Sequence, residues 1–207
     1  MAQIQLTLVS SGAKFTVSDE NIIKVATDTN GAMVQYITEQ SGSRYQAIVS
    51  EDPALIASAS ANLISITDQE TAQDYWINID RISLVDESGT YVNFSYEAEG
   101  ATPQKIYVTQ TIAQFYTLVY EKQGSTVFSY DAVNTGADTI SLTAATGDVT
   151  AQFTLGVVFT VFGSSTAAMN TIWTVTSSTF SGGKTVITVD GDVPTGASST
   201  GELVTNG

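Results

Sequence analysis

The chain of 207 residues carries 7 basic and 21 acidic side chains, which gives a formal net charge of −14, and it contains no histidine and no cysteine. These absences remove the usual ligands of zinc, iron–sulfur and haem sites, the serine–histidine and cysteine–histidine nucleophile systems, and every disulfide. Hydrophobic residues make up 43% of the chain, which is enough to bury a core, so wholesale disorder is not expected.

The acidic balance also argues against two kinds of partner. Nucleic-acid binding needs clustered Lys and Arg, and an anionic membrane surface repels negative charge. The opening residues 1–6 lack the basic start and apolar run of a signal peptide, and no stretch approaches the roughly 20 apolar residues that span a bilayer. The sequence predicts a soluble protein made in the cytoplasm, with no nucleic-acid and no membrane partner.

Apolar alternation rather than helical spacing dominates the chain, and it predicts β-strands. In chain order, the alternating runs are Ile4–Leu8, Phe15–Val17, Tyr75–Ile79, Tyr91–Tyr96 and Thr185–Val189. Turn-forming clusters stand between the runs, at Asp28–Gly31, Asp86–Gly89, Ser181–Gly183 and Asp190–Gly191. The predicted fold class is mostly β.

The first half of the chain contains two similar segments, which align when Phe15 is placed on Tyr75. This displacement between aligned residues is called the repeat offset below. Apolar positions then fall on apolar positions: Phe15, Val17, Ile22 and Val25 fall on Tyr75, Ile77, Ile82 and Val85. In each segment a glycine turn follows (Gly31 or Gly89), then a second strand, then a third strand centred on Tyr45–Val49 or Ile106–Val108. A repeat of this length predicts duplication of a small β domain rather than a solenoid.

A short helix is expected at the end of each copy, over Ser50–Ala57 and Thr109–Leu118. In the first, Ser50 is the predicted N-cap, with Glu51, Asp52 and Pro53 in the opening turn. The expected organisation is therefore tandem small β-barrel or β-sheet modules with one short helix each, over residues 1–62 and 63–123, followed by a C-terminal all-β module over residues 124–207.

The C-terminal region is rich in Thr, Ser and Gly, and residues 138–207 carry only six charges. Strands are expected at Thr139–Leu142, Phe159–Phe162, Ile172–Val175 and Val186–Val189. Because charged side chains usually protect the edges of a sheet, their scarcity favours a region covered by another chain or subunit. The alternative is an ordinary sheet face that Thr and Ser hydroxyls solvate.

Two acidic turns are candidates for cation sites. Asp28-Thr29-Asn30-Gly31 resembles the start of a calcium loop, and Glu39 stands where such a loop has its bidentate Glu, but the rest of the loop pattern is not met. Asn-Gly between two strands is a common hairpin turn, and a turn is preferred here. Asp190-Gly191-Asp192 offers two carboxylates, yet Asp-Gly after a strand again predicts a turn.

Three other chemistries find weak support. Paired carboxylates for glycoside hydrolysis would have to come from acids that stand mostly in predicted turns or at helix starts: Asp19, Glu20, Glu51, Asp52, Asp86, Glu87, Glu97 and Glu99. Gly182-Gly183-Lys184-Thr185 lacks the first glycine of a phosphate-binding loop, where Ser178 stands, and a strand follows it. Most aromatic residues alternate with aliphatic ones, as a core requires, and packing is also preferred for Tyr116 and Tyr120. We therefore expect no catalytic, cofactor-binding or metal-binding residues and no cofactor.

Two resemblances rest on these patterns. Ile4–Leu8, Lys14–Val17, Asn21–Val25, a glycine turn, a strand and Val49-Ser50-Glu51 before a short helix resemble a small β module seen in FlbD-like proteins and in many tailed-phage virion proteins. Ile77–Val85 repeats the module, although Val108-Thr109-Gln110-Thr111 replaces its last element, which makes the second copy the weaker match.

Residues 147–203 are similar to a β module that recurs in structural proteins of tailed bacteriophages. The residues that carry this similarity include Gly147–Thr150, Phe153, Phe159–Val161, Gly163–Thr166, Trp173–Ser178 and Lys184–Val189. The chain departs from the module at Ala167–Asn170, a stretch that often contains glycine there.

The resemblances imply a non-enzymatic virion structural protein of a tailed phage, an auxiliary or decoration protein that binds the capsid surface and stabilises the shell. The implied partners are the major capsid protein or another virion protein and further copies of the chain, and the implied location is the virion. A tail, baseplate or fibre-adaptor component is the alternative within this class. A carbohydrate-binding or adhesion module with exposed aromatics, and turn carboxylates that hold calcium, is the alternative from another class.

Overall fold

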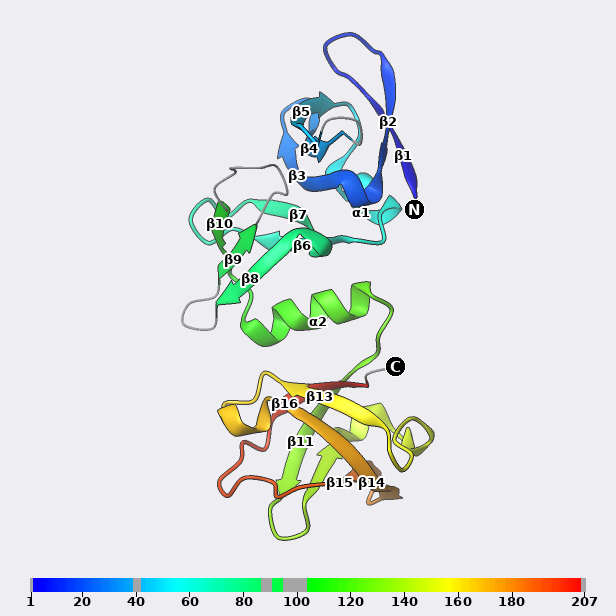
Figure 1. Cartoon of the computed structure of the whole chain (residues 1–207), viewed down its shortest axis with the longest axis vertical. Helices are drawn as coiled ribbons and strands as arrows, with labels where there is room; N and C mark the ends of the chain where they lie inside the picture. The colour runs from blue at the N-terminus through cyan, green and yellow to red at the C-terminus, as the bar shows by residue number, and fades with distance from the viewer. Residues whose placement is uncertain (1, 39–41, 87–90, 95–103, 206–207) are drawn as a thin grey trace. The chain divides into compact units, whose positions relative to one another are not determined.

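The computed structural model describes residues 2–38, 42–86, 91–94 and 104–205, and it is mostly β, as the alternation predicts. The chain divides at Gly124 into two compact units, residues 1–123 and residues 124–207 (Figure 1). No helix in the described ranges has the length and apolar character that a membrane span needs.

Unit 1 contains one order of elements twice. The first series is β1 (Gln3–Thr7), β2 (Lys14–Ser18), the 3-10 helix η1 (Asp19–Asn21), β3 (Ile22–Asp28), β4 (Gly31–Ile37), β5 (Arg44–Val49) and α1 (Pro53–Ala59). The second series is β6 (Leu63–Thr67), β7 (Asp74–Asn78), η2 (Ile79–Arg81), β8 (Ile82–Asp86), β9 (Tyr91–Phe94), β10 (Gln104–Tyr107) and α2 (Ile112–Lys122). The end of the alternating run at residues 95–96, and the predicted turn at residues 87–89, lie outside the described residues.

The described strands of unit 1 form three antiparallel sheets, and one of them combines both series. Their strand orders are β1-β2, β5-β4-β3-β7-β6 and β10-β9-β8. In the five-stranded sheet, β3 of the first series pairs with β7 of the second. A bulge follows the first residue of β3, between Ile22 and Lys24, and β8 has the same irregularity between Ile82 and Leu84.

Backbone hydrogen bonds also recur at the repeat offset. The hairpin between β1 and β2 is closed by Leu8 N–H donating to the Ala13 carbonyl at 2.9 Å, and the β6–β7 hairpin by Asp68 N–H donating to the Gln73 carbonyl at the same distance. The left-handed residue of the first turn is Gly12, and that of the second is Ala72. Because alanine rarely adopts a positive φ, the second turn keeps its conformation at a local cost.

The two helices end their series in similar positions, but both begin later than the sequence predicts. Asp52, not Ser50, caps α1: its carboxylate accepts the Ala54 N–H at 2.7 Å, and Pro53 takes the first helical position. The second helix begins at Ile112 rather than Thr109, because Thr111 and Gln114 form a capping box. Each helix packs on β6, and α1 also contacts β3 and β4.

Unit 2 is a closed barrel of six antiparallel strands. The strands are β11 (Val127–Asn134), β12 (Thr139–Leu142), β13 (Val158–Phe162), β14 (Ile172–Ser181), β15 (Lys184–Val189) and β16 (Gly201–Thr205), and their order around the barrel is β11-β12-β15-β14-β13-β16. All four strands predicted in this region are present. Each of these six strands pairs on both sides, so none of them has an open edge, and coverage of this region by another chain stays a prediction.

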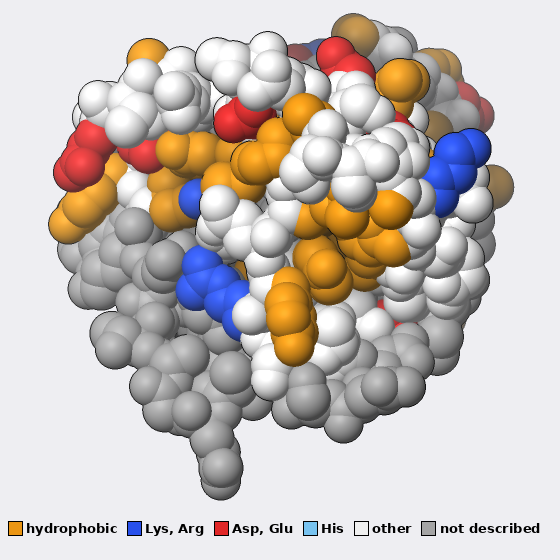
Figure 2. All heavy atoms as spheres, turned by 90° about the horizontal axis from the view of Figure 1, so that it is seen from above, with side chains coloured by type: hydrophobic (Ala, Val, Ile, Leu, Met, Phe, Trp, Pro, Cys, Tyr) orange, Lys and Arg blue, Asp and Glu red, His pale blue; other side chains and the backbone are white. Residues whose placement is uncertain are grey.

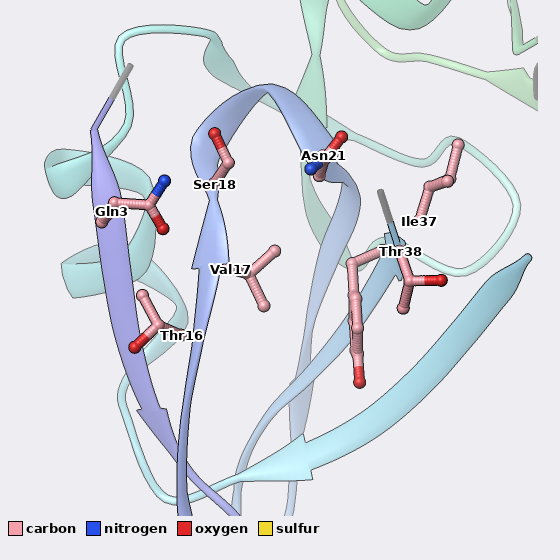
Figure 3. A pocket seen from close by; sticks show the side chains of 8 residues that line it. Gln3, Thr16, Val17, Ser18, Asn21, Ile37 and Thr38 are labelled. Atoms are coloured by element: carbon pink, nitrogen blue, oxygen red, sulfur yellow. The ribbon is translucent and has the colours of Figure 1, made fainter. Parts of the chain in front are cut away.

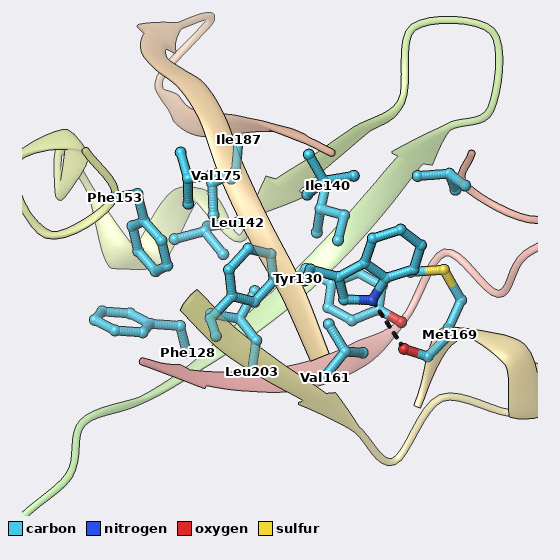
Figure 4. Close-up of a cluster of buried hydrophobic side chains, with 14 residues drawn as sticks. Phe128, Tyr130, Ile140, Leu142, Phe153, Val161, Met169, Val175, Ile187 and Leu203 are labelled. Carbon is cyan, nitrogen blue, oxygen red and sulfur yellow. Dashed lines mark hydrogen bonds between the residues drawn. The ribbon is translucent and has the colours of Figure 1, made fainter. Parts of the chain in front are cut away.

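The barrel encloses a dense aromatic and aliphatic core (Figure 4). Phe153 lies edge-on to both Phe128 and Phe159, with ring centroids 5.4 and 5.9 Å away. The Trp173 indole N–H donates to the Met169 carbonyl at 3.2 Å, which satisfies a buried donor. Gly201 lies against the Tyr130 ring so closely that a Cβ would come within 2.6 Å of its hydroxyl, so only glycine fits there.

The Glu51 side chain, just before α1, links the end of the first series to β1. The Glu51 carboxylate accepts the Thr7 N–H at 3.0 Å, and at the same place in the second series the Gln110 amide oxygen accepts the Thr67 N–H at 3.2 Å. Burial raises the pKa of Glu51, but the hydrogen bonds from Thr7 and the nearby Lys14 charge together outweigh it, so the net pKa lies below its ordinary 4.5. Gln110 makes the equivalent bond without a titrating group.

We therefore expect Glu51→Gln to weaken the acid sensitivity of unit 1. The folded carboxyl stays charged at lower pH than the unfolded one, so its contribution is present above the ordinary pKa and is lost as pH falls through the lowered value. The variant should cost about 1 kcal/mol at pH 7, where a charged acceptor becomes a neutral one, and it should lose less stability than the parent between pH 7 and pH 3.

Urea unfolding measures this effect. The chain has two tryptophans, Trp76 in unit 1 and Trp173 in unit 2, so a Trp173→Phe background reports on unit 1 alone. Gln110→Glu is the matched control, because it adds a titrating group at the equivalent position and should increase the acid sensitivity. Equal losses of stability in the parent and in Glu51→Gln would contradict the assignment.

Candidate functional site

The most fully built polar site in the described residues is the junction between the two series of unit 1, and Asn78 lies at its centre. Asn78 is completely buried at the end of β7. Its amide nitrogen donates to the carbonyls of Ile22 at 2.8 Å and Asp19 at 3.2 Å, with a longer contact of 3.4 Å to the Glu20 carbonyl. Its amide oxygen accepts the Asp80 N–H at 2.9 Å. One side chain therefore joins η1 and β3 of the first series to η2 of the second.

Strand pairing and charge add to this junction. Lys24, Val25 and Ala26 of β3 face Ile77, Trp76 and Tyr75 of β7. The Lys24 ammonium lies 4.1 Å from the centre of the Tyr75 ring, a cation–π contact, and burial lowers the pKa of Lys24, as does the charge of Arg44, while Asp68 opposes them. The Arg81 guanidinium donates to the Glu20 carbonyl at 3.0 Å. The second series thus binds the first through backbone, amide and cation contacts together.

A hollow of about 300 Å³ lies beside β2 in the first series (Figure 3). Its lining comes from β1, β2, η1 and the end of β4: Gln3, Thr16, Val17, Ser18, Asn21, Tyr36, Ile37 and Thr38. Figure 3 shows Val17 extending from β2 toward the side where Ile37 and Thr38 lie. At the repeat offset, Thr16, Val17, Ser18 and Asn21 correspond to Trp76, Ile77, Asn78 and Arg81, the residues with which the second series holds the first.

Ser18 lines this hollow, and its side-chain hydroxyl makes no hydrogen bond. Only 3% of Ser18 is exposed, and its hydroxyl is buried without a hydrogen-bond partner. Ser18 precedes η1 but makes no side-chain cap, whereas Asn78 caps η2. An unpaired buried hydroxyl costs about 1–3 kcal/mol, so this position favours a partner that supplies an acceptor.

An aromatic row crosses β2, β4 and β5 next to the hollow. The Tyr36 ring lies 5.7 Å from Phe15 and 5.9 Å from Tyr45, and 48% of Tyr45 is exposed. Burial raises the pKa of Tyr36, and Tyr45 adds to the rise, so the Tyr36 phenol stays neutral at physiological pH.

Tyr36 also borders a second hollow of about 490 Å³, between residues 8–10, the β3–β4 turn and residues 46–48. Figure 2 shows the face at the top of Figure 1, where a band of hydrophobic side chains crosses the middle and acidic side chains lie mainly along the upper rim.

Of the two acidic segments considered as cation sites, the first forms the predicted turn at Thr29 and Asn30, and the second is a bend after a strand. Asp28 ends β3, Gly31 begins β4, and the Asp28 carboxylate accepts the Asn30 N–H at 3.0 Å. Asp190 and Gly191 follow β15, where the Asp190 N–H donates to the Thr174 carbonyl at 2.9 Å. Within the described ranges, no three His, Cys, Asp or Glu side chains come together as metal ligands would.

The other acids and the glycine-rich motif have local structural roles. Asp19 is buried and accepts the N–H groups of Ala2, Glu20 and Ala61, while Asp52 caps α1. Glu87, Glu97 and Glu99 lie outside the described residues, and the side chain of Asp86 is not described. Gly182 and Gly183 form the β14–β15 turn with positive φ, and the Lys184 ammonium pairs with Asp131 at 2.6 Å.

Tyr116 of α2 packs as its spacing predicts, and Tyr120 lies against the Tyr116 ring. Tyr116 contacts the cluster that contains Phe115, and the two tyrosine rings lie 6.4 Å apart. The residues that sequence reasoning missed are Asn78, Arg81 and Ser18. Their signal lies in the comparison at the repeat offset, which places a polar residue on a polar residue at the end of an apolar strand (Ser18 on Asn78). The apolar positions alone, which reveal the repeat, do not reveal this pair.

The fold and the junction define a mostly β protein whose best-formed polar site, among the described residues, joins one strand series to another. Comparisons with protein-family models, with curated proteins and with solved structures found no match to this chain. The function is therefore inferred from the geometry of the chain itself.

Asn78→Ala should destabilise unit 1 by roughly 2–3 kcal/mol, because it removes the donor that serves the Ile22 and Asp19 carbonyls and leaves buried groups unpaired. Urea unfolding followed by Trp76 fluorescence in the Trp173→Phe background measures the loss. In a Trp76→Phe background, Trp173 should show unit 2 unchanged. A loss below about 0.5 kcal/mol, the size typical of a surface substitution, or an equal loss in both units, would refute the central role of Asn78.

Proposed function

We propose that this protein is a non-enzymatic virion structural protein of a tailed phage, an auxiliary or decoration protein that binds the capsid surface. The observation that carries the proposal is the β3–β7 junction, where one small β series docks onto another through strand pairing and the Asn78 amide. Within this proposal the two series are tandem copies of one module, and the barrel of unit 2 is a separate C-terminal β module. Such a chain is suited to making contacts between β modules.

The charge supports a role at an assembled surface. A net charge of −14 favours docking onto a basic surface and keeps free copies from sticking nonspecifically. Each copy that binds the assembled shell and not its free subunits stabilises the shell by mass action. The expected partners are the major capsid protein or another virion protein, and further copies of this chain.

Copy counting by mass spectrometry of purified particles tests the proposal. A capsid protein of this kind should be present in hundreds of copies per particle, and particles made without it should release their DNA at a lower temperature. Added back in purified form, the protein should restore the release temperature. A few copies per particle would indicate the tail, baseplate or fibre adaptor, and its absence from particles would overturn the proposal.

The aromatic row favours carbohydrate binding as a second candidate function. Phe15, Tyr36 and Tyr45 present neighbouring rings beside the larger hollow, an arrangement on which sugar rings can stack. On this hypothesis Tyr45→Ala should reduce binding to a glycan array at least tenfold. Tyr107→Ala, at a residue of similar exposure (44% against 48%), is the matched control and should leave binding unchanged. An array on which the parent protein binds no glycan would exclude the hypothesis.

A further inference from the structure

Unit 1 has two strand edges that repeat the two halves of its own internal junction. In the part of the chain that the structure describes, β2 pairs only with β1, and β8 pairs only with β9. β2 is the counterpart of β7, which receives β3, and β8 is the counterpart of β3, down to the same bulge. Among the described strands, β2 therefore presents an open acceptor edge and β8 an open donor edge.

We infer that copies of this chain associate head to tail, with β8 of one copy adding to β2 of the next. The internal register, moved by the repeat offset, predicts the pairs: Lys24↔Ile77 becomes Leu84↔Val17, Val25↔Trp76 becomes Val85↔Thr16, and Ala26↔Tyr75 becomes Asp86↔Phe15. The occupant of the hollow beside β2 is thus a second copy, and the internal junction shows how it binds. The inference deepens the proposed assembly role, but it rests on the junction geometry.

The directions of the backbone groups agree with this pairing. The Asp19 N–H donates to the Ala2 carbonyl, and the Leu8 N–H to the Ala13 carbonyl, so odd-numbered residues of β2 bond to β1. Because bonding alternates along an antiparallel strand, the N–H and C=O of Thr16 point to the free edge. The same alternation in β7 directs Trp76 toward Val25 of β3, and Val85 occupies the position of Val25 in β8.

The polar half of the acceptor is Ser18. Asn78 holds the carbonyls of Asp19 and Ile22, whose counterparts in the donor copy are the carbonyls of Ile79 and Ile82. A serine hydroxyl at the position of Asn78 donates one hydrogen bond where the amide donates more than one. The contact between copies is therefore weaker than the internal junction, and it is reversible.

The pairing of the β8 edge with the β2 edge determines which kinds of assembly can form. Since the donor edge (β8) and the acceptor edge (β2) are different surfaces of the described chain, the association is heterologous, and it builds a closed ring or an open filament according to the rotation between successive copies. The β2 and β8 edges, which could otherwise pair with any exposed strand, then pair with each other in a single register.

Two proline variants of the full-length protein test the inference by complementation. Thr16→Pro removes the outward N–H of the acceptor edge, and Val85→Pro removes that of the donor edge. The parent should show mass increasing with concentration in sedimentation velocity. Each variant alone should stay monomeric, because one of its edges is blocked. A mixture of the two should form 1:1 dimers and nothing larger, since only one open pair of edges remains.

Lys14→Pro is the matched control. It alters the same strand and the same edge, but its counterpart Asp74 has no partner in β3, so the association should match that of the parent. Trp76 fluorescence and circular dichroism report whether each variant is folded. A parent that stays monomeric at millimolar concentration, or folded proline variants that fail to complement, would overturn the inference.

Ser18→Asn tests the same contact without proline. The amide restores the side chain that holds the internal junction, and it should tighten association roughly tenfold, the equivalent of about 1.4 kcal/mol. No gain in affinity from a folded Ser18→Asn protein would count against the predicted register. All these measurements use purified protein without particles, so the inference stands or falls separately from binding to a capsid.

Discussion

The edges of β-strands are the constraint on which this structure depends. A strand carries backbone N–H and C=O groups on both sides, and each group needs a partner or water. Unit 2 meets the constraint by closing its six described strands into a barrel, so none of them is left with an open edge. Unit 1 pairs β3 with β7, which joins two similar series in one sheet, and among the described strands β2 and β8 are two of those that keep a single strand neighbour.

The sequence predicts the strands well because their signal is local. Alternation places Ile4, Leu6 and Val17 on the buried face, and all three are buried. At the repeat offset, strands β2 and β3 of the first series fall on strands β7 and β8 of the second. The burial predictions need only neighbouring residues, since burial on a pleated strand follows a period of two.

What the sequence does not reveal depends on pairing between distant residues. The barrel closes through β11 and β16, where Val127 pairs with Val204, and no local pattern encodes that contact. The N-cap prediction was wrong at Ser50 for a similar reason. The Glu51 carboxylate accepts the Thr7 N–H from a distant strand, so the chain reaches helical geometry only at Pro53, with Asp52 as the cap.

The candidate site escapes sequence reasoning for the same physical cause. Asn78 acts on the carbonyls of Asp19 and Ile22, which lie 59 and 56 positions earlier in the chain. An asparagine at the end of an apolar strand is equally typical of a turn, so its type alone does not indicate a buried junction. Only the fold brings η1 and the start of β3 against the end of β7.

The difference in hydrogen-bonding capacity between Ser18 and Asn78 matches the difference between a contact within one chain and a contact between chains. Within one chain the two series are tethered, so the effective concentration of β3 at β7 is high, and a strong amide contact makes the junction permanent. Between chains there is no tether, and a permanent contact at every edge would polymerise the protein before it reached its partner. A weaker hydroxyl at Ser18 keeps the same geometry while association waits for a high local concentration. Under the proposed function, a shell that gathers many copies would supply that concentration, and the edges of neighbouring copies would then pair.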